Sequence, residues 1–212
     1  MLDNLAISYY ITARGQLATP PGQDGKEEAL QRQVRASFSA GVGYVQVREK
    51  DLPGRRLAQI VEDLQDSPEK KGSRLLVNER LDLAIACGAD GVHLPSDSLP
   101  LSAARSKAGR EWIVGISCHT EEEVEEALRD GASYVLWGPV FETPSKPGAA
   151  PLGLSDLARL CRRFAIPIFA LGGVNVENAK DCVQAGAAGV AGIRLFQQAS
   201  NLEEVCRYLH SL

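Results

Sequence analysis

Four glycine-containing segments recur along the chain, and each leads into a run of β-branched or other apolar residues. They span residues 40–48, 87–94, 130–137 and 185–193. A stretch with the apolar spacing of an amphipathic helix precedes each of them. Glycine tolerates the positive φ with which many helices end. We therefore interpret each segment as the joint between a helix and the strand that follows it.

Four further apolar runs lie between these joints, at residues 9–12, 74–78, 112–117 and 168–171. The two sets together predict eight strands, each followed by a helical pattern. Near-continuous apolar runs are typical of strands that are buried on both faces of a parallel sheet. Eight such units in 212 residues predict an α/β fold, a (β/α)₈ TIM barrel that forms a single domain over residues 1–212. A doubly wound open sheet is the structural alternative.

Composition excludes several classes of protein. The formal net charge of −4 and the pI near 5.5 give no support to a nucleic-acid partner. No apolar run approaches the roughly 18 residues of a membrane helix, and no secretory signal is visible. The five cysteines are an odd number without metal-ligand spacing, which is typical of free thiols in a reducing, cytoplasmic compartment. The sequence leaves open whether the chain forms a homodimer.

Basic side chains gather where the predicted strands end. The carboxyl ends of the strands form the active face of such barrels. An acidic protein here places four cations at that face, which are Arg48, Lys50, Lys146 and Arg194. This arrangement concentrates positive potential where an anion would enter and predicts small phosphorylated ligands. The two long loops of this face, residues 13–25 and 138–153, are of a length that is usually functional.

The pair Gly172-Gly173 follows the seventh predicted strand. Two glycines let the backbone approach a ligand closely, and Asn175 is a suitable first residue for the next helix. The N–H groups of that helix would favour a phosphate, and the loops after strands seven and eight are the usual phosphate site of these barrels. The alternative is a tight turn that needs only the flexibility of glycine.

Gln46, Arg48 and Lys50 alternate along the second predicted strand and its end. Alternate residues of a strand share one face, so Gln46 and Arg48 point together into the barrel. With Lys50 nearby they suit a diphosphate, because Arg supplies a bidentate fork and Lys a point charge. The alternative is a structural ion pair of Arg48 with Glu49 or Glu79.

Two histidines lie near this face. We interpret His93 as a hydrogen-bonded core residue at the end of the fourth strand. His119 follows the fifth strand, and its reference pKa suits a general acid or base. The residues alone leave a catalytic and a structural role for His119 equally open.

The chain resembles the thiamine phosphate synthase/TenI superfamily over nearly its whole length. Five motifs carry the resemblance in the family's order: Val45-Gln46-Val47-Arg48-Glu49-Lys50, Val77-Asn78-Glu79-Arg80, Gly91-Val92-His93-Leu94, Gly115-Ile116-Ser117-Cys118-His119-Thr120 and the lid Gly138-Pro139-Val140-Phe141-x-Thr143-x-Ser145-Lys146. Any one of them would be a weak signal, whereas all of them in order are specific.

The family contains two chemistries. The synthase of thiamine biosynthesis couples hydroxymethylpyrimidine diphosphate to a thiazole phosphate carboxylate and releases diphosphate with the help of Mg²⁺. A TenI-type tautomerase moves a proton on the thiazole phosphate with a histidine that matches His119. We favour the synthase, because the family's diphosphate contacts are intact in this chain. The second alternative is a barrel that binds thiazole phosphate without turnover.

The resemblance also assigns roles to individual residues. It implies that Arg48, Lys146 and His119 are the catalytic candidates. The pyrimidine diphosphate would be bound by Gln46, Arg48, Lys50, Asn78, Ser117, Thr143, Ser145 and Lys146. The thiazole phosphate would be bound by Gly172, Gly173, Ile193 and Arg194, although the synthase usually has a serine where this chain has Arg194.

The chain departs from the synthase at the metal. The family binds Mg²⁺ through two aspartates, and this chain has Glu79 in place of the first and Ser98 in place of the second. Either Asp97 substitutes for the second aspartate by a shift of one position, or the metal site is lost.

Overall fold

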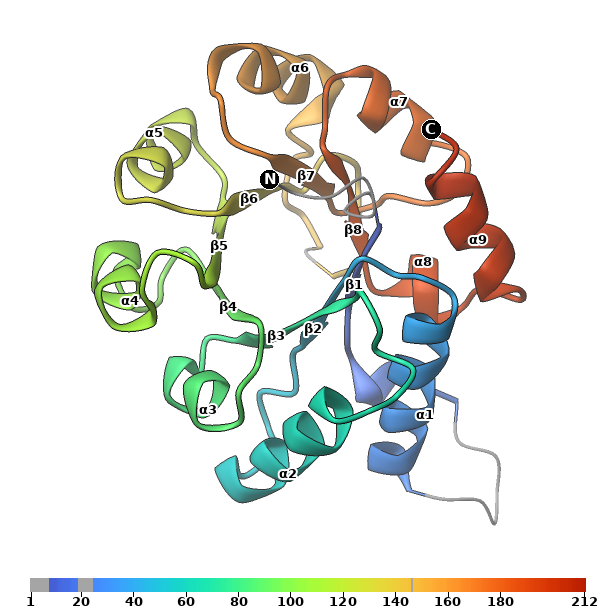
Figure 1. The fold of residues 1–212 in the computed structure, drawn as a ribbon. Helices are drawn as coiled ribbons and strands as arrows, with labels where there is room; N and C mark the ends of the chain where they lie inside the picture. The colour runs from blue at the N-terminus through green and yellow to red at the C-terminus, as the bar shows by residue number, and fades with distance from the viewer. Residues whose placement is uncertain (1–7, 19–24, 146) are drawn as a thin grey trace.

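The described part of the chain folds as a closed barrel of parallel strands surrounded by helices. The structure is a computed structural model and describes residues 8–18, 25–145 and 147–212. Strand order follows chain order, and β1 pairs with β8 to close the barrel. Figure 1 shows the helices outside the ring of strands. The predicted (β/α)₈ fold is therefore confirmed.

The strands are short, and short helices alternate with them. The strands are β1 (Ser8–Ile11), β2 (Tyr44–Val47), β3 (Arg74–Asn78), β4 (Gly91–Leu94), β5 (Ile113–Cys118), β6 (Tyr134–Trp137), β7 (Ile168–Leu171) and β8 (Gly189–Gly192). The helices are η1 (Arg14–Gln16), α1 (Lys26–Ser39), α2 (Gly54–Gln65), α3 (Leu81–Ala86), α4 (Leu101–Ala108), α5 (Glu121–Arg129), α6 (Gly153–Arg163), α7 (Ala179–Gln184), α8 (Arg194–Gln197) and α9 (Leu202–Leu209).

Glycines end the helices at the predicted joints. Gly41, Gly88, Gly131 and Gly186 each have a positive φ, between 63° and 100°, in the turn before a strand. The predicted strands 74–78 and 168–171 coincide with β3 and β7, and the predicted strands 9–12 and 112–117 are each displaced by one residue from β1 and β5. Within the described residues, no helix is long and apolar enough to cross a membrane. All five cysteines are free thiols.

Aromatic rings fill the interior of the barrel. Tyr9, Tyr44, Tyr134 and Phe169 are buried there, and their ring centroids lie 5.6–5.9 Å apart. A second, larger apolar core lies between the strands and the helices. The aromatic layer thus fills the barrel interior with buried rings.

Gly115 makes room for this layer. It lies on β5, where it pairs in register with both His93 of β4 and Tyr134 of β6. A Cβ atom at Gly115 would lie 1.9 Å from the Tyr134 ring, closer than real side chains approach. The glycine of the Gly-x-Ser-x-His motif is therefore required by packing inside the barrel.

We expect Gly115→Ala to lower the free energy of unfolding by about 3 kcal/mol, at the upper end of the cost of overpacking a core. Chemical denaturation followed by circular dichroism measures this change. Gly15→Ala is the matched control, since a Cβ atom there meets nothing within 4 Å. Equal stability of the two variants would contradict this account of Gly115.

Candidate active site

A cavity of about 650 Å³ opens at the carboxyl ends of the strands. Thirteen residues that the sequence assigns to binding, catalysis or metal coordination line it. These are Gln46, Arg48, Lys50, Asn78, Asp97, Ser117, His119, Thr143, Ser145, Gly172, Gly173, Ile193 and Arg194. The fold thus brings together residues from loops that are more than 140 positions apart in the chain.

The charge of the cavity wall is positive. Arg48 and Lys50 come from the end of β2, and Arg194 comes from the start of α8 on the other side of β1. Among the described residues of the lining, Asp97 carries the one carboxylate. Lys146, which the sequence also assigns to this face, lies outside the described residues. The wall is therefore suited to a multiply charged anion.

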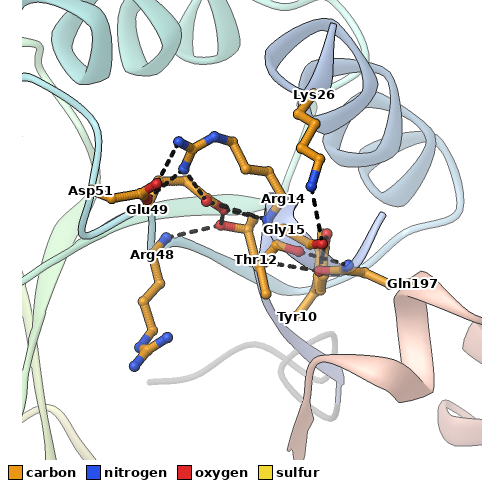
Figure 2. Close-up of polar contacts among 10 residues, drawn as sticks. Tyr10, Thr12, Arg14, Gly15, Lys26, Arg48, Glu49, Asp51 and Gln197 are labelled. Carbon is orange, nitrogen blue, oxygen red and sulfur yellow. Dashed lines mark hydrogen bonds and ion pairs between the residues drawn. The ribbon is translucent and has the colours of Figure 1, made fainter. Parts of the chain in front are cut away.

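An ion pair fixes the loop after β1 to the end of β2. The Arg14 guanidinium contacts the Glu49 carboxylate at 3.0 Å and holds Asp51 through two hydrogen bonds of 2.7 Å (Figure 2). Thr12 Oγ1 donates to Glu49 Oε1 at 2.7 Å and accepts from the Arg48 backbone N–H at 2.9 Å. The Arg14 guanidinium lowers the pKa of Asp51. We call Thr12, Arg14, Glu49 and Asp51 the loop clasp.

The loop is held from its other side by Gln197 of α8. The Gln197 amide accepts from the Ala13 N–H at 2.9 Å and donates to the Ala13 carbonyl at 3.1 Å. The Tyr10 hydroxyl donates to the same Gln197 oxygen at 3.0 Å. The loop therefore links the β2 side of the cavity to the α8 side.

The clasp explains why the Arg48 guanidinium faces the cavity. Glu49 is buried, with its side chain 3% exposed, and its carboxylate is taken up by Arg14 and Thr12. Arg48 extends away from the clasp, and among the described residues its guanidinium makes no ion pair (Figure 2). The alternative that Arg48 forms a structural ion pair with Glu49 or Glu79 is wrong. Arg48 and Glu49 follow the end of β2, and their side chains point in different directions (Figure 2).

Six polar side chains form a continuous chain of hydrogen bonds beneath the cavity. We call it the floor chain, and its members in order are Ser117, His93, Tyr134, Tyr9, Gln46 and Asn78. At one end, Ser117 Oγ lies 2.9 Å from His93 Nε2, and His93 Nδ1 lies 3.0 Å from the Tyr134 hydroxyl. The prediction that His93 is a hydrogen-bonded core residue is confirmed, as only 2% of it is exposed.

The other half of the floor chain crosses the barrel interior. The Tyr134 and Tyr9 hydroxyls are 2.7 Å apart, and Tyr9 donates to Gln46 Oε1 at 3.0 Å. Gln46 Nε2 then donates to Asn78 Oδ1 at 2.8 Å. Gln46 is 1% exposed and Asn78 8% exposed, so these amides satisfy each other rather than solvent.

Burial keeps the floor chain uncharged. Burial, with a smaller contribution from the Arg48 charge, lowers the pKa of His93 to about 3. Burial also raises the pKa of Tyr9 and that of Tyr134 far above their usual range. The floor is therefore neutral at physiological pH, and the charge of the site lies on the wall above it.

His119 lines the cavity and comes directly before the capping box that Thr120 and Glu123 form at the start of α5. Its Nδ1 atom lies 2.6 Å from the Gly138 carbonyl oxygen. A carbonyl only accepts, so Nδ1 carries the proton of the neutral ring and Nε2 carries its lone pair. The carbonyl of the β6 loop thus sets the tautomer of this histidine.

The glycine pair after β7 has positive φ values and packs against the loop after β6. Gly172 and Gly173 have φ values of +92° and +67°. A Cβ at Gly172 would lie 2.6 Å from Pro139, and one at Gly173 2.4 Å from the Glu142 carbonyl oxygen. Both glycines are thus required where this loop packs against the loop after β6, and both also line the cavity.

The predicted helix start at Asn175 is wrong. Helix α7 begins at Ala179 and has six residues. Asn175 and Asn178 instead cap each other, since each side-chain oxygen accepts the backbone N–H of the other residue, at 3.1 and 2.9 Å. Asparagine side chains that hydrogen-bond nearby backbone stabilise turns in competition with helix.

Of the two predicted metal ligands, Glu79 and Asp97, one lines the cavity. Asp97 lines the cavity, whereas Glu79 is exposed, has a φ of +65° and does not belong to the lining, and neither does Ser98. Across the described ranges, no three His, Cys, Asp or Glu side chains are grouped as metal ligands would be.

Sequence reasoning missed several residues of this site. It assigned Tyr9 and Tyr134 to apolar strands without a polar role, and it did not identify Gln16 or Ser96, which line the cavity. A tyrosine inside a buried strand is itself a signal, because a buried hydroxyl usually has a partner. No local pattern marks Arg14 as the partner of Glu49, 35 positions away.

A family model and several known proteins match this chain. The family model, described as thiamine monophosphate synthase, matches residues 16–196. A thiamine-phosphate synthase of Syntrophomonas wolfei is 42% identical over 185 residues, covering 87% of this chain and 88% of the relative. A thiamine-phosphate synthase of Roseiflexus sp. is 39% identical over 187 residues, covering 88% and 79%.

A solved structure shares the fold over the full length of the chain. It is the thiamine phosphate pyrophosphorylase from Pyrococcus furiosus, with a TM-score of 0.84 and 29% sequence identity. The match covers 100% of this chain and 96% of that structure.

The low pKa of His93 predicts a pH-dependent stability. Because the unfolded chain has the ordinary pKa of 6.5, it binds the proton first as the pH falls. The contribution of the neutral His93 ring to the free energy of unfolding is therefore complete above pH 6.5, and it is lost as the pH falls toward 3. We expect the free energy of unfolding to fall by about 2 kcal/mol from pH 7 to pH 5 through this group alone.

Denaturation at several pH values, on the wild type and on His93→Gln, measures this contribution. The variant should lose most of the pH dependence in this range, and His210→Gln should keep most of it, because His210 is only partly buried. A slope that survives in His93→Gln would contradict the assignment.

Proposed function

The chain belongs to the thiamine monophosphate synthase family, and we propose that it couples a hydroxymethylpyrimidine diphosphate to a thiazole phosphate with release of diphosphate. One observation supports this choice above the others. The loop clasp neutralises Glu49 internally and leaves the Arg48 guanidinium directed into the cavity. A positive wall beside the buried Gln46 and Asn78 has a clear use when a diphosphate must be held as it leaves.

In this proposal the wall stabilises the leaving group. The bond between the pyrimidine methylene carbon and the diphosphate oxygen breaks, and its electron pair leaves with the oxygen. The thiazole nitrogen then forms the new bond to that carbon. Arg48 and Lys50 contact the diphosphate, and Thr143 and Ser145 of the loop after β6 close over it. Preorganised cations at a developing anion are a large source of catalysis.

The thiazole phosphate belongs beyond β1 from Arg48, at the ends of β7 and β8. Gly172, Gly173 and Ile193 line the cavity there, and Arg194 supplies a cation. The loops after β7 and β8 hold phosphate in many such barrels. This placement sets the two phosphorylated groups on the two sides of β1.

Mg²⁺ fits this site as a cofactor with few protein ligands. Mg²⁺ retains water and is commonly held by one or two carboxylates together with substrate phosphates. Asp97 is the one carboxylate of the described lining, and Glu79 lies outside it. We therefore assign the protein's share of the metal site to Asp97. When bound, Mg²⁺ would offset the negative charge of the diphosphate.

A thiazole tautomerase is the second candidate, and the His119 geometry favours it. The Gly138 carbonyl fixes the tautomer in which Nε2 carries the lone pair, as a general base requires. This reaction has no diphosphate, however, and would leave the Arg48 side of the wall without a direct role.

The test is a coupling assay with the purified chain, both substrates and Mg²⁺. We expect thiamine phosphate and diphosphate in equal amounts. Isomerisation of the thiazole phosphate carboxylate without diphosphate release would replace the proposal by the tautomerase. The absence of both reactions would leave a binding protein.

Variants of the wall separate the two chemistries. We expect Arg48→Met to lower kcat/KM for coupling by about 100-fold, because a charge on the developing anion is often worth about 3 kcal/mol. His119→Asn should cost less than about tenfold, since leaving-group loss needs no proton transfer there. Steady-state kinetics of both variants checks this order, and the reverse order would contradict the synthase.

The metal assignment has its own test. We expect Asp97→Asn to raise the Mg²⁺ concentration for half-maximal coupling about tenfold or more, because a carboxylate ligand is lost. Glu79→Gln is the matched control and should leave that concentration unchanged. A larger shift for Glu79→Gln than for Asp97→Asn would show that the family's first metal position is retained.

A further inference from the structure

The floor chain has a single direction, which follows from its amide end. Gln46 donates to Asn78 and accepts from the Tyr9 hydroxyl. A phenol has one proton, and Tyr9 uses its proton on Gln46. In the short contact between the two tyrosines, Tyr134 must therefore be the donor.

The same assignment of donor protons continues from Tyr134 to Ser117. Tyr134 has used its proton on Tyr9, so its oxygen accepts from His93 Nδ1–H. A neutral imidazole carries one N–H, which leaves Nε2 as an acceptor. Ser117 must then donate its hydroxyl proton to Nε2. The steps from Tyr9 to Ser117 are forced, because each hydroxyl and the neutral imidazole has one proton to donate.

We infer that His93 and Tyr134 are positioning residues that turn Ser117 into a pure hydrogen-bond acceptor toward the cavity, while Asn78 is left as a donor. With its one proton committed below, the Ser117 oxygen presents only lone pairs to a ligand. Gln46 donates to the Asn78 oxygen, and Asn78 lines the cavity, so Asn78 offers its amide N–H groups to a ligand as donors.

This polarity divides the floor between two kinds of ligand group. Phosphate oxygens at neutral pH are acceptors, so they match Asn78 and are repelled by the lone pairs of Ser117. A group that donates, such as an exocyclic amine, matches Ser117. Resting on the proposed function, the inference is that Ser117 selects the amine of the pyrimidine and that the diphosphate cannot lie over β5.

The tautomer of His93 tests the direction without any substrate. Long-range ¹H–¹⁵N NMR of the wild-type protein distinguishes a protonated from a bare ring nitrogen. The chain has three histidines, so His119→Asn and His210→Asn assign the His93 signals by elimination. We expect a protonated Nδ1 and a bare Nε2 at pH 7. A protonated Nε2 on His93 would reverse the whole chain and overturn the inference.

Substrate selection tests the consequence. An analogue of the pyrimidine diphosphate with an oxo group in place of the amine offers an acceptor to Ser117. A site built to hydrogen-bond one group rejects the mismatched analogue by a factor of about 10⁴. We expect Tyr134→Phe to lower this ratio of kcat/KM values by about tenfold or more. Without the Tyr134 hydroxyl, His93 Nδ1–H has no acceptor, and the ring can carry its proton on Nε2 instead. The Ser117 hydroxyl is then free to donate to a ligand.

Tyr10→Phe is the matched control, since it removes a buried tyrosine hydroxyl of β1 outside the floor chain. It should leave the amine-to-oxo ratio within about twofold of the wild type. An unchanged ratio in folded Tyr134→Phe would overturn the inference even if coupling is efficient. If the wild type makes no product, the proposed function fails and the His93 tautomer alone decides the inference.

Discussion

The hydrogen bond between the Tyr9 and Tyr134 hydroxyls, inside the barrel, constrains much of the structure around it. A closed eight-stranded barrel must fill its interior with side chains, and this chain uses large aromatic rings. Two of those rings carry hydroxyls that are far from water, and an unpaired buried hydroxyl is costly. The two hydroxyls pair at 2.7 Å, and each has one further partner. The Tyr9 hydroxyl donates to Gln46, and the Tyr134 hydroxyl contacts His93 Nδ1. The Tyr134 ring also explains why residue 115 is a glycine, because any larger residue there would overlap with the ring.

The site thus consists of a neutral floor and a charged wall that are built by different means. The floor is set by packing and by hydrogen bonds among uncharged groups. The wall depends on the loop clasp, where the buried Glu49 needs a cation and takes Arg14 rather than its neighbour Arg48. Breaking a buried ion pair leaves an uncompensated charge, which is strongly unfavourable. The clasp therefore stabilises the loop after β1 and, by the same contact, directs the positive charge of Arg48 toward a ligand.

The sequence predicted the barrel and most of the cavity lining because both depend on local patterns. Gly41, Gly88, Gly131 and Gly186 mark helix ends through their backbone alone, and alternation along β2 is enough to turn Gln46 inward. What it could not predict depends on contacts between distant segments. The pairing of Arg14 with Glu49 and of Tyr9 with Tyr134 is of this kind, and so is the packing that requires Gly173. The helix start at Asn175 failed for a local reason, since two asparagines cap each other there.

The neutral floor also limits which groups can govern the pH dependence of the reaction. His93 is buried beneath the cavity, yet burial lowers its pKa to about 3, and the two tyrosines stay protonated at any physiological pH. Proton exchange along the floor is blocked as well, because Gln46 and Asn78 cannot pass a proton on without turning their amides over. Between pH 6 and pH 8 the floor therefore does not change its charge. A floor that does not titrate keeps its donors and acceptors constant, which is what recognition of an uncharged ring requires.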